Sequence, residues 1–169
     1  MRLGTIELHL QSETPKATYI TRKVEMKYEG ASRIITQYQY TAWPDHGVPS
    51  TTAEMISFRK TVHRELSQHK PCIVHCSAGV GRSGTFMALE TLITRAETLN
   101  DQLEPLEVVR TMRKARNYMV QTIDQYKFIF RAMLDALNKS LSRTRRAIRK
   151  RQVRGKEGGG QGEKEGRRR

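Results

Sequence analysis

The hydrophobic pattern of this chain changes its period near residue 50, and that change limits the fold more than any other feature. Before it, apolar and polar residues alternate, for example in "TIELHLQ" at residues 5–11. Alternation with a period of two is typical of β-strands with one buried face. After it, apolar residues recur at three- and four-residue spacing, which is typical of amphipathic helices. Strands followed by helices predict a mixed α/β (α+β) domain.

The strand-forming part predicts an antiparallel set of three strands. The alternating segments are residues 5–11, 18–28 and 33–43. The middle segment alternates less cleanly, because Arg22 falls in phase with its apolar residues. Glu29-Gly30 predicts a turn between the last two segments, because glycine readily adopts the backbone conformations that turns require.

The helix-forming part predicts a set of helices with recognisable starts. Thr51 and Glu54 have the spacing of a capping box, which predicts that a helix begins there. Proline is tolerated in the first turn of a helix, so Pro105 marks another start. Further helices are expected from Ser83, from Pro105 to about Arg116, and from about Thr122 onward.

The segment "IVHCSAGVGRSGTF" at residues 73–86 joins a predicted strand to a predicted helix through a loop of small residues. The run "CIVHC" at residues 72–76 is short and apolar, and predicts a buried strand. A glycine-rich loop can turn successive backbone N–H groups inward, and the start of the following helix adds partial positive charge. Together they predict a cradle for a tetrahedral dianion.

Two reactive side chains border this cradle. Cys76 would place a thiolate at its floor, where the N–H groups lower the thiol pKa. Arg82 offers a planar fork that can hold two phosphate oxygens. No Gly-Lys-Ser/Thr follows the loop, which argues against a nucleotide-binding P-loop, and no further ligands stand at zinc spacing. A buried cysteine beside a flexible turn would explain Cys76 alone, but not the glycines together with Arg82.

At these residues the chain resembles a known family. The string "HCSAGVGRSGTF" at 75–86 resembles the active-site signature of the cysteine-dependent, tyrosine-specific protein phosphatases. "YTAWPDHGVPS" at 40–50 resembles their acid-bearing loop, and "QTIDQYKFIF" at 121–130 resembles their glutamine loop. The resemblance covers roughly residues 4–137. It implies a partial phosphatase domain, in which antiparallel strands precede a strand, a phosphate loop, a helix and a C-terminal helical set.

The resemblance also implies roles for individual residues. Cys76 would attack the phosphorus of phosphotyrosine and form a cysteinyl-phosphate, while Arg82 holds the phosphoryl oxygens. Asp45 would protonate the leaving phenolate and then act as a base toward water. Gln121, assisted by Gln125, would position that water. The other implied site residues are Ser83, which helps the sulfur leave, His75, which orients Cys76, and the loop residues Ser77, Ala78, Gly79, Val80 and Gly81.

Several of these residues also have a purely structural interpretation. Asp45 could be a turn residue, since Asp favours turns, and Gln121 could be a polar residue at a helix start. His75 is expected to be buried, and Cys72 is expected to be a core residue. The resemblance implies neither a metal nor a cofactor.

The family domain also has a large N-terminal portion, with a tyrosine-bearing loop that selects phosphotyrosine. We identify no equivalent in residues 1–35, which suggests a truncated catalytic region. Two functions therefore stay open. One is a protein tyrosine phosphatase, and the other is a weak or inactive fragment that binds phosphate or phosphoproteins.

The net charge of +14 is concentrated at the C-terminal end. From Lys139 onward there are 13 basic and 3 acidic residues. The closing "GKEGGGQGEKEGRRR" has no apolar side chain to offset its ordering entropy, so it is expected to be disordered. We therefore expect a partial catalytic domain at residues 1–141 and a basic, largely disordered tail at 142–169. The tail is either a solvated extension or an arm that contacts polyanions or acidic membranes.

The cysteine usage indicates a reducing compartment. Cys72 and Cys76 are only four residues apart and cannot staple a fold. No run approaches the roughly 20 apolar residues of a membrane span, and the N-terminus lacks the apolar core of a signal peptide. We expect a cytoplasmic protein that acts on phosphotyrosine-containing proteins. The intracellular part of a receptor and a nuclear location stay open.

Overall fold

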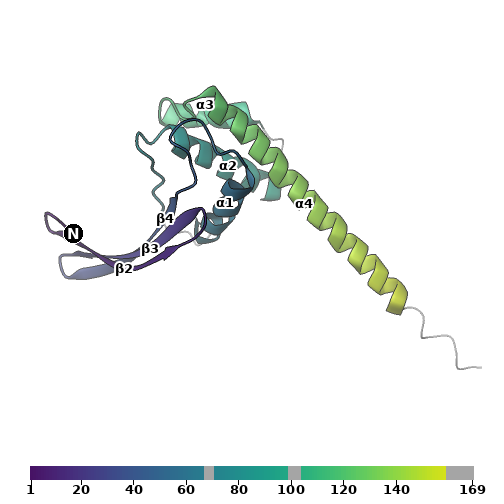
Figure 1. The fold of residues 1–169 in the computed structure, drawn as a ribbon, viewed down its shortest axis with the longest axis horizontal. Helices are drawn as coiled ribbons and strands as arrows, with labels where there is room; N and C mark the ends of the chain where they lie inside the picture. Colours follow the sequence, from purple (N-terminus) through teal and green to yellow (C-terminus); the bar gives the residue numbers. More distant parts are fainter. Residues whose placement is uncertain (67–70, 99–103, 159–169) are drawn as a thin grey trace, which may run out of the picture.

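A computed structural model describes residues 1–66, 71–98 and 104–158 (Figure 1). Strands come first and helices follow, which confirms the mixed α+β class. The elements are β1 (Arg2–Leu3), β2 (Ile6–Pro15), β3 (Tyr19–Tyr28), β4 (Ala31–Tyr40), α1 (Ala53–Leu66), α2 (Gly81–Thr98), α3 (Pro105–Ala115) and α4 (Ile123–Gly158).

The strands form one antiparallel sheet in the order β1-β2-β3-β4. The predicted turn between β3 and β4 is confirmed: Tyr28 pairs with Ala31, and both intervening residues have positive φ, 47° at Glu29 and 78° at Gly30. Such two-residue turns match the twist of antiparallel strands. Arg22 donates hydrogen bonds to side chains of β2 and β4, namely Glu13, Gln37 and Gln39, which explains why it interrupts the apolar pattern.

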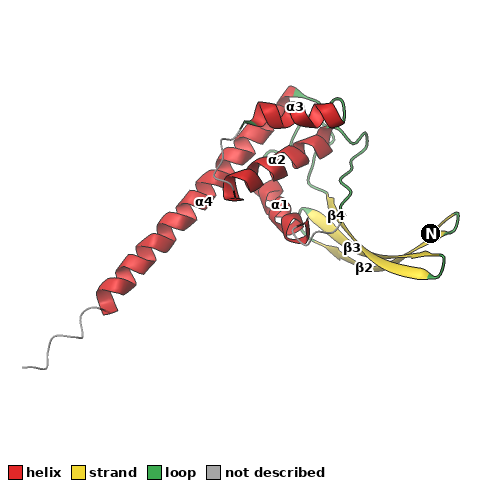
Figure 2. Cartoon of the chain, turned by 180° about the vertical axis from the view of Figure 1, so that it is seen from behind, coloured by secondary structure: helices red, strands yellow, loops and turns green. Residues whose placement is uncertain are grey.

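Only one end of the sheet packs against the helices. Phe58 of α1 meets the rings of Tyr19 and Tyr40 at centroid distances of 5.4 and 5.1 Å. The other end projects away from the helical body, as Figure 2 shows. Apolar side chains on that end stay exposed, including Leu10 at 60% and Ile34 at 56%. The core therefore lies among the helices and the near end of the sheet.

The helical core centres on α2, which packs against α1, α3 and α4. Its buried apolar side chains include Phe86, Leu89, Leu92 and Ile93 of α2. Helical spacing in the sequence predicts a face made of Phe86, Leu89, Leu92, Ile93 and Ala96, and the first four are buried while Ala96 is half-buried.

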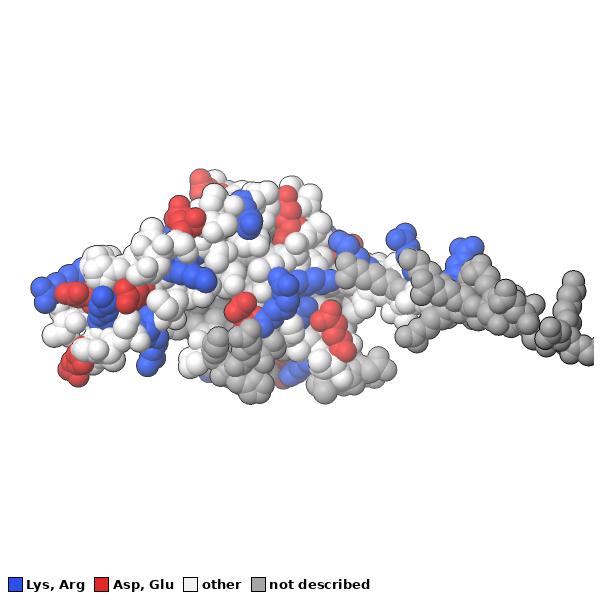
Figure 3. Space-filling view, turned by 90° about the horizontal axis from the view of Figure 1, so that it is seen from below, with Lys and Arg blue, Asp and Glu red and all other residues white. Residues whose placement is uncertain are grey.

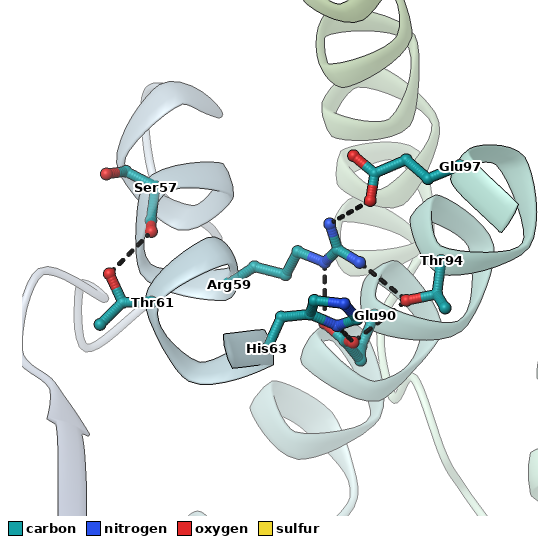
Figure 4. Close-up of polar contacts among 7 residues, drawn as sticks. All are labelled: Ser57, Arg59, Thr61, His63, Glu90, Thr94 and Glu97. Atoms are coloured by element: carbon teal, nitrogen blue, oxygen red, sulfur yellow. Dashed lines mark hydrogen bonds and ion pairs between the residues drawn. The ribbon is translucent and has the colours of Figure 1, made fainter. Parts of the chain in front are cut away.

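A buried charged cluster joins α1 to α2 (Figure 4). Arg59 is 1% exposed, and its guanidinium donates to Glu90 at 2.7 Å, to Thr94 at 2.7 Å and to Glu97 at 3.0 Å. His63 contacts the second oxygen of Glu90 at 2.5 Å. A buried cation is tolerated only when its hydrogen bonds are satisfied in this way.

The predicted capping box at Thr51 and Glu54 is wrong in its detail. The helix α1 begins at Ala53, so Thr52 precedes it. The Thr52 hydroxyl donates to Asp135 of α4 at 2.5 Å. The Thr52 side chain at the start of α1 therefore makes a tertiary contact with α4.

The predicted buried strand at residues 72–76 is also wrong. The structure assigns no strand there, Ile73 is 89% exposed and Cys72 is exposed as well. A strand needs a neighbour for its N–H and C=O groups. The described sheet ends at β4 on one side and β1 on the other, and does not include this segment.

The last helix reaches into the basic tail. The tail was expected to be largely disordered from residue 142, with the last predicted helix able to extend into the basic run at residues 142–152, and α4 continues without a break to Gly158. Residues 159–169 lie outside the described residues, and the domain boundary after residue 141 stays a prediction. Arg, Lys, Ala and Gln favour helix, and extending an existing helix costs little compared with starting one. In the described part of the chain, no helix is both long and apolar enough to cross a membrane.

Candidate active site

The phosphate loop runs from Cys76 to the start of α2 at Gly81. Gly79 has φ of 72°, a left-handed conformation that glycine adopts at little cost. This bend lets the Gly79 N–H group point back at Cys76 Sγ, 3.2 Å away. The sulfur therefore lies at the positive end of α2, as the sequence predicted.

The pKa of Cys76 is lowered to about 7 by its surroundings. Burial acts the other way, because it disfavours the charged thiolate. The Ser83 hydroxyl and the backbone N–H groups of Ser83, Gly79 and Val80 outweigh burial by favouring the thiolate. Ser83 Oγ is buried and makes no hydrogen bond of ordinary geometry to any described residue, so no other group takes its proton, which is available to the sulfur. A large fraction of Cys76 is thus ionised near neutral pH.

The loop between α3 and α4 packs against the start of α2. The Val120 N–H group donates to the Val80 carbonyl at 3.0 Å, which also accepts from Gly84 N–H. The two backbones lie so close that a Cβ at Gly84 would be 2.4 Å from Val120 N. Val120 itself has φ of 60°, a strained conformation for a β-branched residue. Arg113 holds this strained residue by donating to the Val120 carbonyl at 2.9 Å.

The two predicted glutamines lie against the phosphate loop at the start of α4. Gln125 Oε1 accepts from the Gln121 N–H group at 2.9 Å, and Gln125 N–H donates to the Thr122 hydroxyl at 3.2 Å, which caps the helix. A Cβ at Gly81 would be 3.0 Å from Gln125 Nε2 and 3.2 Å from Gln121 Oε1. Both amide side chains therefore border the same loop as Cys76.

Arg82 connects the phosphate loop to the loop that carries Asp45. Its guanidinium donates to the Pro44 carbonyl at 3.0 Å and lies 5.9 Å from the centroid of the Trp43 ring. Trp43 is buried and donates from Nε1 to the Gly47 carbonyl at 3.2 Å, which closes this short loop on itself. The Asp45 side chain is exposed next to Pro44.

Not every predicted residue lies where the sequence suggested. His75 is exposed, so its expected burial is wrong, and Cys72 is not a core residue. Both deviations follow from the missing strand at residues 72–76. The loop residues Ser77 and Ala78 are exposed, while Gly79 and Val80 are partly buried.

Two arginines at this site were not identified from the sequence. Arg116 donates to the Ala78 carbonyl at 3.1 Å and lies over Gly79, where a Cβ would be 3.3 Å from its Nη2. Arg113 donates to the Met119 carbonyl at 2.9 Å. Arg113 lies in the last turn of α3 and Arg116 is its C-cap, with an extended backbone. The available signal was a pair of arginines three residues apart at the end of a predicted helix.

The site has the chemistry of a nucleophile in an anion-binding cradle. It combines a thiolate-prone cysteine, inward N–H donors, a guanidinium and a nearby carboxyl group. In the described ranges, no group of three or more His, Cys, Asp or Glu side chains is placed to hold a metal ion.

Comparisons with known proteins match the same region. A family scan matches "Protein-tyrosine phosphatase" over residues 1–135. "Tyrosine-protein phosphatase non-receptor type 4" of Mus musculus is 41% identical over 134 residues, which are 78% of this chain and 14% of that protein. "Receptor-type tyrosine-protein phosphatase eta" of Gallus gallus is 41% identical over 139 residues, 79% of this chain and 10% of that protein. The chain thus spans only a small part of the length of these relatives.

Proposed function

Because this chain belongs to the protein-tyrosine phosphatase family, we propose that it hydrolyses phosphotyrosine monoesters on proteins through a cysteinyl-phosphate intermediate. The observation that carries the proposal is the environment of Cys76. Its sulfur accepts a hydrogen bond at 3.2 Å from the Gly79 N–H group, in the loop that leads into α2, and its pKa is lowered to about 7. These features supply a nucleophile at the position where a phosphate would bind.

In the first step, Cys76 Sγ attacks phosphorus while the bond from phosphorus to the phenolic oxygen breaks. Arg82 holds two phosphoryl oxygens, and the N–H groups of the loop bind the others. Asp45 gives its proton to the leaving phenolate, so that tyrosine departs neutral. The contact between Arg82 and the Pro44 carbonyl places the Asp45 loop beside the phosphate loop before substrate arrives.

In the second step, water displaces sulfur from phosphorus. Gln121, with Gln125, orients the water, and the Asp45 carboxylate takes its proton. The Ser83 hydroxyl donates to the departing thiolate, which its buried and otherwise unpartnered oxygen supports. His75 precedes the nucleophile and orients its backbone. Neither a metal nor a cofactor takes part in this scheme.

Turnover of an aryl phosphate such as p-nitrophenyl phosphate tests this proposal. We expect the parent chain to be active and Cys76→Ser to show only the background rate. Cys72→Ser is the matched control, because it removes an exposed thiol four residues away, and it should keep the parent rate. Equal background rates in the parent and in Cys76→Ser would refute an enzymatic function for this chain.

A second candidate is a weak or inactive fragment that binds phosphoproteins. It is favoured by the segment at residues 72–76, which leads into the site without forming a strand and in which Ile73 is 89% exposed. It predicts saturable binding of a phosphotyrosine peptide without turnover. Titration of a labelled peptide against the parent, with Arg82→Ala as the non-binding control, measures this.

We also propose that the basic C-terminal segment contacts polyanions and that the chain functions in the cytoplasm, in phosphotyrosine signalling. Between Lys139 and Gly158 there are nine basic residues and one acidic residue, which supports binding to negative partners. A cysteine nucleophile needs a reducing compartment, and Cys72 and Cys76 are both free thiols in the structure. Retention on immobilised heparin, lowered by salt, tests the polyanion contact.

A further inference from the structure

Exposed apolar side chains follow one face of α4. They are Ile123 at 73%, Phe130 at 41%, Leu134 at 57% and Leu141 at 58% exposure. Because a helix turns about 100° per residue, these four positions fall within a sector of about 40°. The buried face of α4 is a different one, and it carries Gln125, Phe128, Ile129 and Ala132. We call the four exposed residues the apolar stripe.

A row of basic residues borders the apolar stripe on one side. It consists of Lys127, Arg131, Arg145 and Arg149, which by the same rotation lie about 60° to 100° from Phe130. All four are exposed, and Figure 3 shows Lys and Arg side chains along the helix where it leaves the body. Two acidic residues of α4 border this row: Asp124, three residues before Lys127, and Asp135, four residues after Arg131. We call the four residues the basic row.

The apolar stripe crosses from the folded body onto the projecting part of the helix. Phe130 and Leu134 lie among the core-packed residues of α4, between Ile129 and Ala136, whereas Leu141 follows the last of these residues. Beyond them α4 extends away from the body (Figure 1). The combined surface is therefore long and straight, and the folded body covers its opposite side only at one end.

We propose that this face of α4 binds the surface of a bilayer that contains anionic lipids. The apolar stripe enters the boundary between headgroups and acyl chains, and the basic row binds the negative headgroups. This inference rests on the polyanion contact proposed above and assigns it one class of partner. It makes α4 an interfacial helix that lies on the membrane.

The exposed leucines favour a bilayer over nucleic acid. The phosphate backbone of a nucleic acid binds Lys and Arg side chains, but it offers no apolar surface to exposed Leu or Phe side chains. The continuity with the body favours a flat surface over a protein that wraps around a helix, because Phe130 and Leu134 lie on the body and cannot be enclosed.

Sedimentation with vesicles tests the proposal on the full chain. We expect binding to vesicles of phosphatidylcholine with phosphatidylserine, weakened by salt, and little binding to phosphatidylcholine alone. Leu134→Gln with Leu141→Gln should lower the apparent affinity by about tenfold or more, because buried apolar area supplies much of the binding.

Two charge-matched variants test the orientation. Arg145→Gln with Arg149→Gln removes two charges from the basic row, and Lys139→Gln with Arg146→Gln removes two from the opposite side of the same helix. We expect the first pair to weaken vesicle binding clearly more than the second. Circular dichroism and the thermal midpoint should match the parent in every variant, because all of these side chains are exposed.

Three outcomes would overturn the proposal. They are no binding to anionic vesicles, equal losses for the two charge pairs, and binding to duplex DNA or to a helix-binding protein that exceeds vesicle binding. Heparin retention in the same variants separates the two proposals. If heparin retention persists while vesicle binding fails, the bilayer assignment is wrong and the polyanion contact stands. Activity of the Cys76 site is measured independently of both.

Discussion

At the scale of single residues, the site depends on a balance of opposing effects at one sulfur. Burial would keep Cys76 protonated, and hydrogen bonds from α2 and its loop outweigh burial. Asp45 is exposed next to Pro44, whose carbonyl is held by Arg82. Cys76 and Asp45, the proposed nucleophile and proton donor, are thus positioned by separate contacts, and each can be removed without the other.

Asp45→Ala should slow the first chemical step by about 10²- to 10⁴-fold and leave substrate binding intact, because in the proposed mechanism Asp45 donates a proton and does not hold the phosphate. Steady-state kcat and KM for an aryl phosphate check this. His46→Ala, an exposed neighbour in the same loop, is the control. Turnover by Asp45→Ala as fast as the parent would show that the acid assignment is wrong.

Ser83→Ala should raise the pKa of Cys76 above its parent value of about 7, because it removes a hydrogen bond that favours the thiolate. Only the thiolate reacts, so alkylation of Cys76 by iodoacetamide increases as pH rises through its pKa. The rising limb of rate against pH should shift to higher pH in the variant. Measuring in a Cys72→Ser background removes the second thiol. An unchanged limb would mean that Ser83 does not stabilise the thiolate.

At the scale of elements, the site is built where α2 meets the loop before α4. Gly84 allows the backbone of α2 to approach Val120, and this contact places the glutamines of α4 beside the phosphate loop. The opposite side of α2 is held to α1 by Arg59 and Glu90. Contacts on both sides therefore fix the position of α2, whose first turn borders Cys76.

Gly84→Ala should destabilise the chain by about 1–3 kcal/mol, because the added Cβ would lie 2.4 Å from Val120 N and neither backbone can move freely. Thermal or urea unfolding measures the change. Gly4→Ala is the control: it introduces a positive-φ alanine with nothing within 4 Å, so it should cost less. Equal effects of the two substitutions would contradict the close approach.

Glu90→Gln should destabilise the chain by about 3–5 kcal/mol, because it leaves the buried guanidinium of Arg59 without its main partner. Glu97→Gln is the matched control. Glu97 also pairs with Arg59, but the Glu97 side chain is 40% exposed. Its loss should be below about 1 kcal/mol. Urea unfolding compares the two. Similar losses of unfolding free energy in the two variants would show that burial of an ion pair does not determine how much it contributes to stability.

At the scale of the whole molecule, the described chain is a helical body between a projecting sheet and a projecting helix (Figures 1 and 2). Both ends carry exposed apolar side chains, including Leu10 and Ile34 on the sheet and Leu141 on α4. The segment at residues 72–76 runs between these parts without a strand partner. Packing is therefore concentrated around α2.

The amides of residues 72–76 should exchange with deuterium much faster than those of β3, which is paired on both sides. Hydrogen exchange followed by mass spectrometry of peptides measures the difference. The paired amides of β4 in the same experiment serve as the internal reference. Protection of residues 72–76 equal to that of β3 would show that they form a strand in solution.

Local patterns were enough to predict β2, β3, β4 and the four helices, and they also indicated the candidate site residues. Alternation predicted β2, β3 and β4, and the order of glycine, cysteine and arginine predicted the phosphate loop. The sequence did not show which strands pair with one another. The run at residues 72–76 has the composition of a buried strand, but in the structure it has no strand neighbour. The support from Arg113 and Arg116 was missed for a related reason: their partners are backbone carbonyls, which leave no trace in a sequence.

The sequence by itself determined the chemistry of the site, because a thiol, a guanidinium and small residues at fixed spacing have few other uses. It also determined the helical and strand periods, which depend on neighbouring residues. Only the tertiary structure decided which polar groups meet: Arg59 with Glu90, Thr52 with Asp135, and Val120 with Val80. It also decided that one face of α4 stays exposed. Contacts between distant residues depend on packing of the whole chain, and local composition does not encode that packing.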